Sequence, residues 1–428
     1  MPPQALRLKD PAVNISVRFL EELSANYRGC GFAVRLWDGT EWCNAHRPHF
    51  TLVLRHPGAL RNMFMSPTEL TLGEAFIHDD FDVEGDLEGG FELADFLLNR
   101  DYSVIEKLKL GGLLARLPAE GAKENGRQGA DLGGSIHSKE RDRKAVSYHY
   151  DVSNEFYSLW LDRSMVYSCA YFQSTRDGID TAQTQKLDYI CRKVRLRAGD
   201  RLLDLGCGWG GLLIHAAMNY GVEAFGITLS VPQAEMARQR IQEAGLGDRC
   251  RVEVCDYRDL ETGLEFDKIV SVGMFEHVGE ALLPEYFREA WIRLRPGGVF
   301  LNHGIAASPI FHRKGPSFID KYVFPDGELV PVSTTLRAAE SAGFEVRDVE
   351  SLREHYALTL RQWVRRLESK AERAQSIVGE TTYRVWRLYM SGSAHAFATG
   401  RLNLYQILLS KPDRGESHLP LTREDWYS

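Results

Sequence analysis

The sequence predicts an α/β fold in which a doubly wound, mainly parallel, Rossmann-like sheet with helical insertions follows a small α+β N-terminal domain. A glycine-rich turn after Asp204 joins an apolar strand-like run to a helical run. Strand-like and helical runs then alternate from residue 201 to residue 305, which favours parallel strands with crossover helices. Polar side chains stand where these runs end, and ligands of such sheets bind beyond the carboxyl ends of the strands.

Composition and charge narrow the function classes. The chain has 428 residues, enough for two or three domains. A net charge of −7 argues against a nucleic-acid binder. The sequence offers neither a membrane-spanning run nor a secretory signal, and seven cysteines indicate reduced thiols, so we expect a cytoplasmic protein. Cys250 and Cys255 have no second pair to complete a zinc site, so no metal is expected.

Residues 1–105 are expected to form the α+β domain. They contain no acid–base pair and no nucleophile constellation, so we interpret them as a packing or binding domain. The expected elements are a helix at 11–27, a hairpin at 32–42 turning at Asp38-Gly39, a strand at 50–54, a short helix at 59–64, an extended acidic stretch at 76–85 and a helix at 91–98.

Residues 106–144 are expected to form a linker. Between residues 118 and 134 the chain is rich in Gly, Ala, Glu and Gln and has almost no large apolar side chains. A weak basic cluster follows, diluted by Glu140 and Asp142. We interpret it as a solvated face, with a membrane-surface contact as the alternative.

The third segment, residues 145–428, is expected to be the catalytic domain. It opens with aromatic-rich stretches at 148–157 and 164–172 and an amphipathic helix at 181–194. It closes with a helix-rich tail whose aromatic residues would suit either ordinary core or the lining of an apolar channel. These residues are Tyr356, Trp363, Tyr383, Trp386, Tyr389 and Phe397.

The glycine turn itself favours one ligand class. Leu202, Leu203 and Leu205 indicate a buried strand, and Gly206, Gly208 and Gly210 follow. Glycine lets a ligand approach the backbone because no Cβ is in the way. The acid at Asp204 suits a cationic or hydroxyl-rich ligand better than a pyrophosphate, which indicates S-adenosylmethionine rather than NAD. A tight turn without a ligand is the alternative.

Further strands are expected at 222–227, 251–255, 267–272 and 299–305, with a helix at 283–294 that ends at Pro296-Gly297-Gly298. Ser230 and Gln233 have capping-box spacing, so a helix cap is the simplest explanation of both. The side chains expected to meet at the carboxyl edge of the sheet are Asp204, Thr228, Asp256, Glu276 and His303.

Several stretches together resemble the cyclopropane-fatty-acid synthases and their mycolic-acid methyltransferase relatives. The resemblance covers about residue 145 to the end of the chain, and residues 1–105 resemble the family's less distinctive lipid-binding-like domain. The matching stretches are His149-Tyr-Asp-Val-Ser-Asn-Glu-Phe-Tyr, Tyr167-Ser-Cys-Ala-Tyr-Phe, Leu203-Asp-Leu-Gly-Cys-Gly-Trp-Gly-Gly, Gly226-Ile-Thr-Leu-Ser, Gly273-Met-Phe-Glu-His-Val-Gly and Lys321-Tyr-Val-Phe-Pro-Asp-Gly.

The resemblance implies a site for S-adenosylmethionine. The glycines would contact its amino-acid part, Gln233 would reach the ribose, and Asp256 and Tyr257 would flank adenine. The full implied set is Tyr167, Ser168, Asp204, Gly206, Gly208, Gly210, Thr228, Leu229, Ser230, Gln233, Asp256 and Tyr257.

The resemblance also implies that a bound bicarbonate ion serves as the base. Its implied holders are Cys169, Glu276, His303, the backbone of Ile305, and Tyr356. Each has an ordinary alternative: Cys169 could be a buried small hydrophobe and His303 a satisfied core histidine. Ser393 departs from the cysteine that the family often carries at this position, which argues against a thiol role there.

The implied activity is transfer of the methyl group of S-adenosylmethionine to a cis double bond of a phospholipid acyl chain, followed by closure of a cyclopropane ring. Methyl or methylene branching of the same chain shares every step up to the cation. The sequence also leaves open a lipid-binding module with a vestigial cofactor fold and a small-molecule methyltransferase. We expect a cytoplasmic homodimer that touches the inner face of the membrane transiently and binds unsaturated phospholipid.

Overall fold

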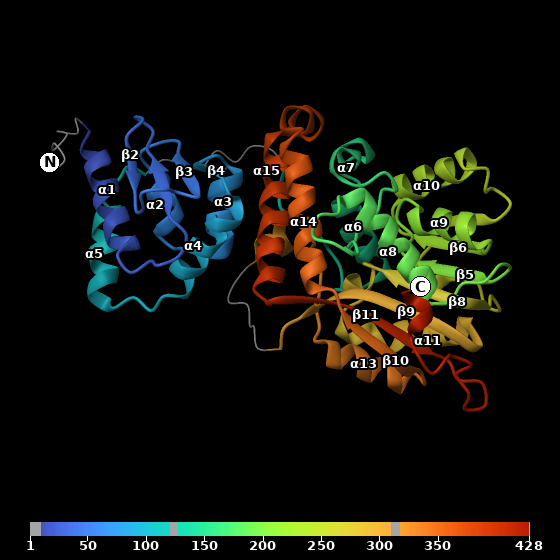
Figure 1. Cartoon of the computed structure of the whole chain (residues 1–428). Coiled ribbons are helices and arrows are strands. Elements are labelled where there is room, and N and C mark those ends of the chain that lie inside the picture. Colours follow the sequence, from blue (N-terminus) through green and yellow to red (C-terminus); the bar gives the residue numbers. More distant parts are fainter. Residues whose placement is uncertain (1–9, 120–126, 310–316, 428) are drawn as a thin grey trace. The chain divides into compact units, whose positions relative to one another are not determined.

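The computed structural model describes residues 10–119, 127–309 and 317–427, and the chain divides into two compact units (Figure 1). The first unit comprises residues 1–128, 314–322 and 379–395. The second comprises residues 129–313, 323–378 and 396–428. Each unit is therefore built from segments that lie far apart in the sequence, and the expected boundaries at residues 105 and 145 do not coincide with this division.

The first unit contains a four-stranded sheet in the order β2-β1-β3-β4. The hairpin predicted at Asp38-Gly39 is confirmed, because β1 and β2 pair antiparallel and Gly39 has a φ of +86°. β1 and β3 are parallel, whereas β3 and β4 are antiparallel. The strands are β1 (Phe32–Arg35), β2 (Glu41–Cys43), β3 (Phe50–Leu54) and β4 (Phe81–Gly85).

The helices of the first unit include one segment from near the end of the chain. Arg384, in the part of α15 that belongs to this unit, donates to the carbonyls of Phe76 at 2.7 Å and Phe81 at 2.6 Å. The unit's helices are α1 (Pro11–Ser24), α2 (Ala59–Phe64), α3 (Glu69–Ile77), α4 (Leu87–Asn99), α5 (Val104–Leu114), α12 (Phe318–Tyr322) and residues 379–395 of α15 (Ala371–Ala398).

Two expectations for the N-terminal region need correction. The stretch expected to be extended from residue 76 begins instead inside α3, whose capping box at Thr68 and Thr71 starts the helix. Residues 106–144 are not wholly a linker, since α5 occupies their start and α6 (Lys139–Tyr150) their end. Of the low-complexity stretch at 118–134, residues 120–126 lie outside the described residues.

The second unit contains a seven-stranded sheet in the order β10-β11-β9-β8-β5-β6-β7. Only β11 runs antiparallel to its neighbours, so the predicted doubly wound, mainly parallel sheet is confirmed. The sequence did not predict β10 and β11, which lie in the tail expected to be helical. The strands are β5 (Arg201–Leu205), β6 (Glu223–Thr228), β7 (Cys250–Val254), β8 (Phe266–Val272), β9 (Leu294–Ala307), β10 (Glu345–Ser351) and β11 (Leu402–Ser410).

Helices cover both faces of this sheet (Figure 1). Side chains of successive strand residues point to opposite faces, so Leu202 packs into one hydrophobic core and Leu203 into the other. The first core is covered by α8 (Ile179–Lys193), α9 (Gly211–Tyr220) and α10 (Val231–Glu243). The second is covered by α11 (Leu283–Arg293) and α13 (Val332–Ser341).

β9 begins earlier than the sequence predicts. We expected Pro296-Gly297-Gly298 to separate α11 from the strand, but β9 already begins at Leu294. The reason is pairing on both sides: Leu294 pairs with Phe266 of β8, and beyond the end of β11 the Gly297 amide donates to the Lys411 carbonyl at 2.7 Å and the Lys411 amide donates to the Gly298 carbonyl at 3.0 Å. The strand therefore continues through residues that would otherwise form a turn.

Three further helices of this unit carry aromatic residues that lie near the site. They are α7 (Asn154–Trp160), α14 (Arg353–Glu368) and α6. Trp160 and Trp363 are fully buried and lie 5.4 Å apart between ring centroids, and Tyr167 lies 5.3 Å from each. Among the described residues, no helix is both long and apolar enough to cross a bilayer.

Candidate active site

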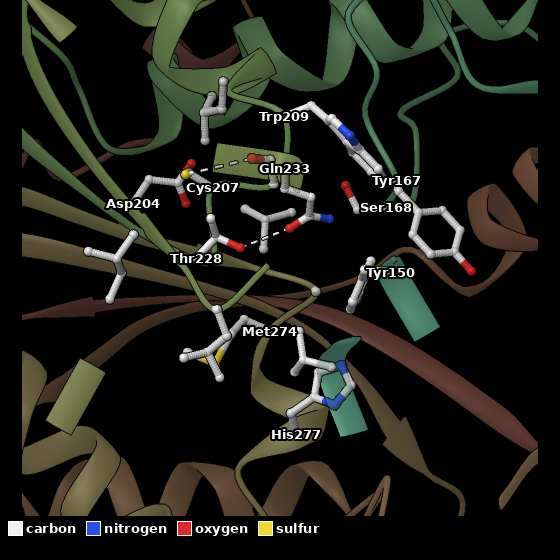
Figure 2. Close-up of a pocket in the computed structure, with 18 of the residues that line it drawn as sticks. Tyr150, Tyr167, Ser168, Asp204, Cys207, Trp209, Thr228, Gln233, Met274 and His277 are labelled. Carbon is white, nitrogen blue, oxygen red and sulfur yellow. Dashed lines mark hydrogen bonds between the residues drawn. The ribbon is translucent and has the colours of Figure 1, made fainter. Parts of the chain in front are cut away.

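A cavity opens at the carboxyl ends of β5, β6, β7 and β8, the edge where the sequence predicted a ligand site (Figure 2). Figure 2 shows Asp204, Cys207 and Thr228 on one side of it and Tyr150, Tyr167 and Ser168 facing them. Ten of the twelve residues that the sequence assigned to the cofactor line this cavity. They are Tyr167, Ser168, Asp204, Gly206, Gly208, Thr228, Leu229, Gln233, Asp256 and Tyr257.

The three glycines of the turn serve different purposes. All have positive φ, at +92° for Gly206, +52° for Gly208 and +77° for Gly210. A Cβ on Gly206 would lie 2.7 Å from that of Met274, whereas a Cβ on Gly208 would meet nothing within 4 Å. Gly210 lies outside the cavity lining, and its Cβ would lie 3.2 Å from that of Ala237. Gly208 therefore leaves open space in the cavity, while Gly206 and Gly210 permit close packing.

Asp204 faces the cavity with one carboxylate oxygen that accepts no hydrogen bond from the described residues. This oxygen, Oδ1, is buried. Burial raises the pKa of Asp204 to about 7, an effect that the charge of Lys186 opposes. A buried carboxylate gains most from a positive charge brought to it. This arrangement suits the cationic S-adenosylmethionine, as the acid in the turn predicted.

Thr228 and Gln233 form one polar edge of the cavity. The Thr228 hydroxyl donates to Gln233 Oε1 at 2.8 Å, so the amide nitrogen of Gln233 remains available to a ligand hydroxyl (Figure 2). Ser230 lies outside the lining and is fully buried. Its hydroxyl accepts from the backbone N–H of Gln233 at 3.3 Å and donates to the Asp151 carboxylate at 2.7 Å. Ser230 is thus the helix cap that its spacing also predicted.

The Asp256 carboxylate forms an ion pair with Arg258. Its carboxylate accepts from Arg258 Nε at 2.8 Å and Nη2 at 2.6 Å, and the same guanidinium reaches Asp142 at 2.8 Å. The Asp256 side chain therefore shapes the cavity wall through Arg258. Tyr257 is buried beside it, and its hydroxyl has no partner within the described parts of the chain.

A second polar cluster is formed by the carboxyl-terminal part of β9 and the short 3-10 helix that follows β8. Glu276 Oε1 accepts from the backbone amide of Ile305 at 2.8 Å, and the amide of Gly273 donates to the carbonyl of His303 at 2.9 Å. Glu276 Oε2 and His303 Nε2 are buried, and neither has a partner among the described residues. Buried polar atoms are normally hydrogen-bonded, so two unsatisfied atoms on neighbouring segments make this cluster a candidate ligand site.

Burial sets the charge states of this cluster. It raises the pKa of Glu276 to about 7, with the Ile305 amide acting in the opposite direction. Burial lowers the pKa of His303 well below its usual range, and the charges of Lys186 and Lys193 lower it further. His303 is therefore neutral at physiological pH, whereas Glu276 can be either protonated or charged.

Cys169 and Tyr356 are tied to the same edge of the sheet through Leu352. The Leu352 carbonyl lies 3.7 Å from Cys169 Sγ and accepts from the Tyr356 amide at 3.1 Å. The Leu352 amide donates to Leu404, which pairs with Ile305 across β11 and β9. Cys169 is fully buried, and burial raises its thiol pKa, so it is no thiolate nucleophile.

Sequence reasoning missed several residues that line the cavity and one, Gln183, that lies behind Ser168. Lys186 is almost fully buried, lines the cavity and donates to Ser168 Oγ at 2.9 Å. Gln183 donates to the carbonyl of Ser168 at 2.9 Å. Their spacing places both on the apolar face of α8, and polar residues on such a face were the available signal. Tyr150, Met274 and His277 also line the cavity, and all three lie within stretches that carry the family resemblance. The described residues contain no cluster of potential metal ligands.

The fold and the cavity at the carboxyl edge of its sheet define an S-adenosylmethionine-dependent methyltransferase. The family model described as "Mycolic acid cyclopropane synthetase" matches residues 137–407. The chain belongs to this family.

Relatives agree with this assignment. A protein of Pseudomonas putida named "Probable fatty acid methyltransferase" is 43% identical over 92% of this chain and 95% of its own. The "Cyclopropane-fatty-acyl-phospholipid synthase" of Escherichia coli K12 is 36% identical over 65% of this chain and 70% of its own. The crystal structure of mycolic acid cyclopropane synthase CmaA1 with SAH and CTAB matches with a TM-score of 0.59 and 32% identity, covering 62% of this chain and 97% of that one.

The open space at Gly208 yields a first prediction. Gly208→Ala should weaken S-adenosylmethionine binding by ~10-fold or more, equivalent to about 1.4 kcal/mol, because the new methyl group occupies the ligand's approach. Gly245→Ala is the matched control, since Gly245 also has a positive φ of +68° and open space but lies outside the cavity. Isothermal titration calorimetry should find normal affinity in the control. Equal affinity in both variants would remove the turn from the binding site.

The raised pKa of Glu276 yields a second prediction. A carboxyl whose pKa is higher folded than unfolded stabilises the fold when protonated, and this stability is lost as the pH rises from about 4.5 to about 7. Glu276→Gln should therefore raise the ligand-free stability at pH ~8, by on the order of 3 kcal/mol, and the gain should vanish near pH 4.5.

Denaturant unfolding at the two pH values measures this difference. The control is Glu280→Gln, the same change at an exposed position four residues further on. A Glu276→Gln variant that is no more stable at pH ~8 than the parent would show that the charged Glu276 carboxylate does not destabilise the fold.

Proposed function

We propose that the protein transfers the methyl group of S-adenosylmethionine to a cis double bond of a phospholipid acyl chain and closes a cyclopropane ring. The family assignment and the name of the Escherichia coli relative support this substrate class. S-adenosylmethionine supplies an electrophilic methyl group when bound. The alkene is a weak nucleophile, so the chain's task is to hold the double bond in line at near-attack distance.

Methyl transfer to an alkene leaves a carbocation on the acyl chain. Water must be excluded from it, and aromatic faces stabilise a cation without reacting with it. Tyr167 lines the cavity and packs against Trp160 and Trp363, which are both fully buried. Tyr167 directly precedes Ser168 and Cys169 in the sequence, which supports a cation site beside the cofactor cavity.

The observation that carries the proposal is the pair of unsatisfied atoms, Glu276 Oε2 and His303 Nε2. Ring closure requires removal of a proton from the transferred methyl group, and a bicarbonate held here would supply the acceptor. Its holders would be Glu276, His303 and Tyr356, with Cys169 at the edge. The Ile305 amide is already engaged by Glu276, so it would act by orienting that carboxyl group. A protonated Glu276 can donate to an anion, which its raised pKa allows.

Methyl or methylene branching of the same acyl chain is the second candidate. One observation favours it: the relatives that match most of this chain are named as fatty acid methyltransferases. Besides the Pseudomonas protein, "Probable fatty acid methyltransferase Rv3720" of Mycobacterium tuberculosis is 39% identical over 86% of this chain. Branching departs from ring formation after methyl transfer: a hydride shift first moves the cation to the methylated carbon, and loss of a proton from the transferred methyl group then gives a methylene branch. A saturated methyl branch additionally requires a hydride donor.

A peripheral membrane contact belongs to the proposal because the substrate is a lipid. On α5, Val104, Ile105 and Leu108 are 73%, 79% and 72% exposed. They lie within one and a half turns of the helix, with the exposed Lys107 beside them. An exposed apolar cluster next to a basic side chain suits a bilayer surface with anionic lipids. We also propose that the enzyme acts from the cytoplasm as a dimer.

The function is tested with purified protein, S-adenosylmethionine and unsaturated phospholipid vesicles, with and without added bicarbonate. The expected product gains the mass of one CH2 group per modified chain, and fragmentation distinguishes a ring from a branch. Glu276→Gln should lose ~10²-fold or more in turnover and keep its affinity for S-adenosylmethionine. Glu280→Gln should turn over normally. Normal turnover of Glu276→Gln without any bicarbonate dependence would contradict the proposal.

The membrane contact is tested by replacing Val104, Ile105 and Leu108 with serine. The triple variant should sediment far less with anionic vesicles, because burying these three side chains would contribute several kcal/mol. Met218→Ser is the control, since Met218 is 63% exposed on α9 of the other unit. Undiminished sedimentation of the triple variant would place the membrane contact elsewhere.

A further inference from the structure

Three polar side chains form a row across neighbouring strands behind the candidate base site. Glu350 on β10 stands opposite Gln406 on β11, and Gln406 stands opposite His303 on β9. Directly paired residues of antiparallel strands project to the same face of the sheet. This face is covered by α8, whose last residue is Lys193. Gln406, His303 and Lys193 are all fully buried.

Lys193 fixes the orientation of the Gln406 amide. Its Nζ lies 2.6 Å from Glu350 Oε2, 3.1 Å from Gln406 Oε1 and 3.2 Å from Asp348 Oδ2. An ammonium group has three N–H donors and no acceptor. Glu350 and Gln406 must therefore accept hydrogen bonds from Lys193, while Asp348 forms an ion pair with it. Gln406 can do so only through its oxygen, which turns its NH2 group toward His303.

The oriented amide fixes the proton on the imidazole. Gln406 Nε2 lies 3.1 Å from His303 Nδ1. The amide nitrogen can only donate, so Nδ1 must accept and carries no proton. His303 is neutral because burial and the nearby charges of Lys186 and Lys193 lower its pKa. The single ring proton is then on Nε2, the atom without a partner among the described residues.

We propose that Lys193 and Gln406 are positioning residues that lock His303 in its Nε2–H tautomer and aim one hydrogen-bond donor into the site. The tautomer follows from this row alone. Its use rests on the proposed function: an N–H donor stabilises a bound anion, whereas the other tautomer would present a lone pair to it. The alternative is that the ion pair of Lys193 with Glu350 only joins α8 to the sheet. In that case the tautomer of His303 would not be fixed.

The proposal is tested by NMR of the full-length protein carrying ¹⁵N-labelled histidine, with His303 assigned from its loss in His303→Gln. The parent protein should show a protonated Nε2 and an unprotonated Nδ1. Gln406→Glu replaces the donor beside Nδ1 with an acceptor, so the proton should move to Nδ1. Asn302→Asp is the matched control: it makes the same change one residue from His303 on the opposite face, where Asn302 accepts from Tyr286. It should keep the proton on Nε2.

Lys193→Met is a second variant that removes the ammonium without adding a charge. The released amide can then rotate, and both His303 tautomers should appear. Gln406→Glu should also lose about 10²-fold in turnover while its affinity for S-adenosylmethionine is unchanged. If the protein makes no ring at all, the NMR result still stands, so failure of the proposed function is distinguishable. A protonated Nδ1 in the parent, or an unmoved proton in Gln406→Glu, would overturn the proposal.

Discussion

The pairing of β9 between β8 and β11 is the constraint on which the site depends. It buries His303 at the centre of the sheet, and the bond from Gly273 to the His303 carbonyl holds the loop that carries Glu276 against the strand end. Because side chains alternate along a strand, a slip of one residue would turn His303 away from Gln406 and toward the opposite core. The long pairing with β11, from Val299 to Ala307, prevents such a slip.

Burial of titratable groups shifts their pKa values in this site and lowers the stability of the fold. Burial displaces the pKa of each of four groups toward the neutral form: Asp204, Lys186, Glu276 and His303. A cation at Asp204 would relieve part of this loss of stability, and under the proposed function an anion beside a protonated Glu276 and His303 would relieve another part. The site is therefore organised for its ligands before they arrive, as a catalytic site with strong electrostatic stabilisation requires.

Features encoded over short stretches could be predicted from the sequence. The glycine turn, the five parallel strands and the polar residues at their ends depend on local periodicity and on the shared direction of the strands. Features that depend on pairing between segments far apart in the sequence could not be predicted. The β11 stretch reads Leu402-Asn-Leu-Tyr-Gln-Ile-Leu-Leu-Ser without clean alternation, and only its partners β9 and β10 make it a strand. Lys193 and Gln406 are 213 residues apart, so no spacing rule links them. The motif identified Glu276 and His303, but their unsatisfied atoms appear only in three dimensions.

The proposed function requires this site to remove a proton from the transferred methyl group. Turnover with S-adenosylmethionine that carries a trideuterated methyl group measures this removal. In the expected product, the ring carbon derived from that methyl group keeps two deuterons and has lost the third to the medium. A product that retains all three deuterons on an intact methyl branch would contradict the proposed function.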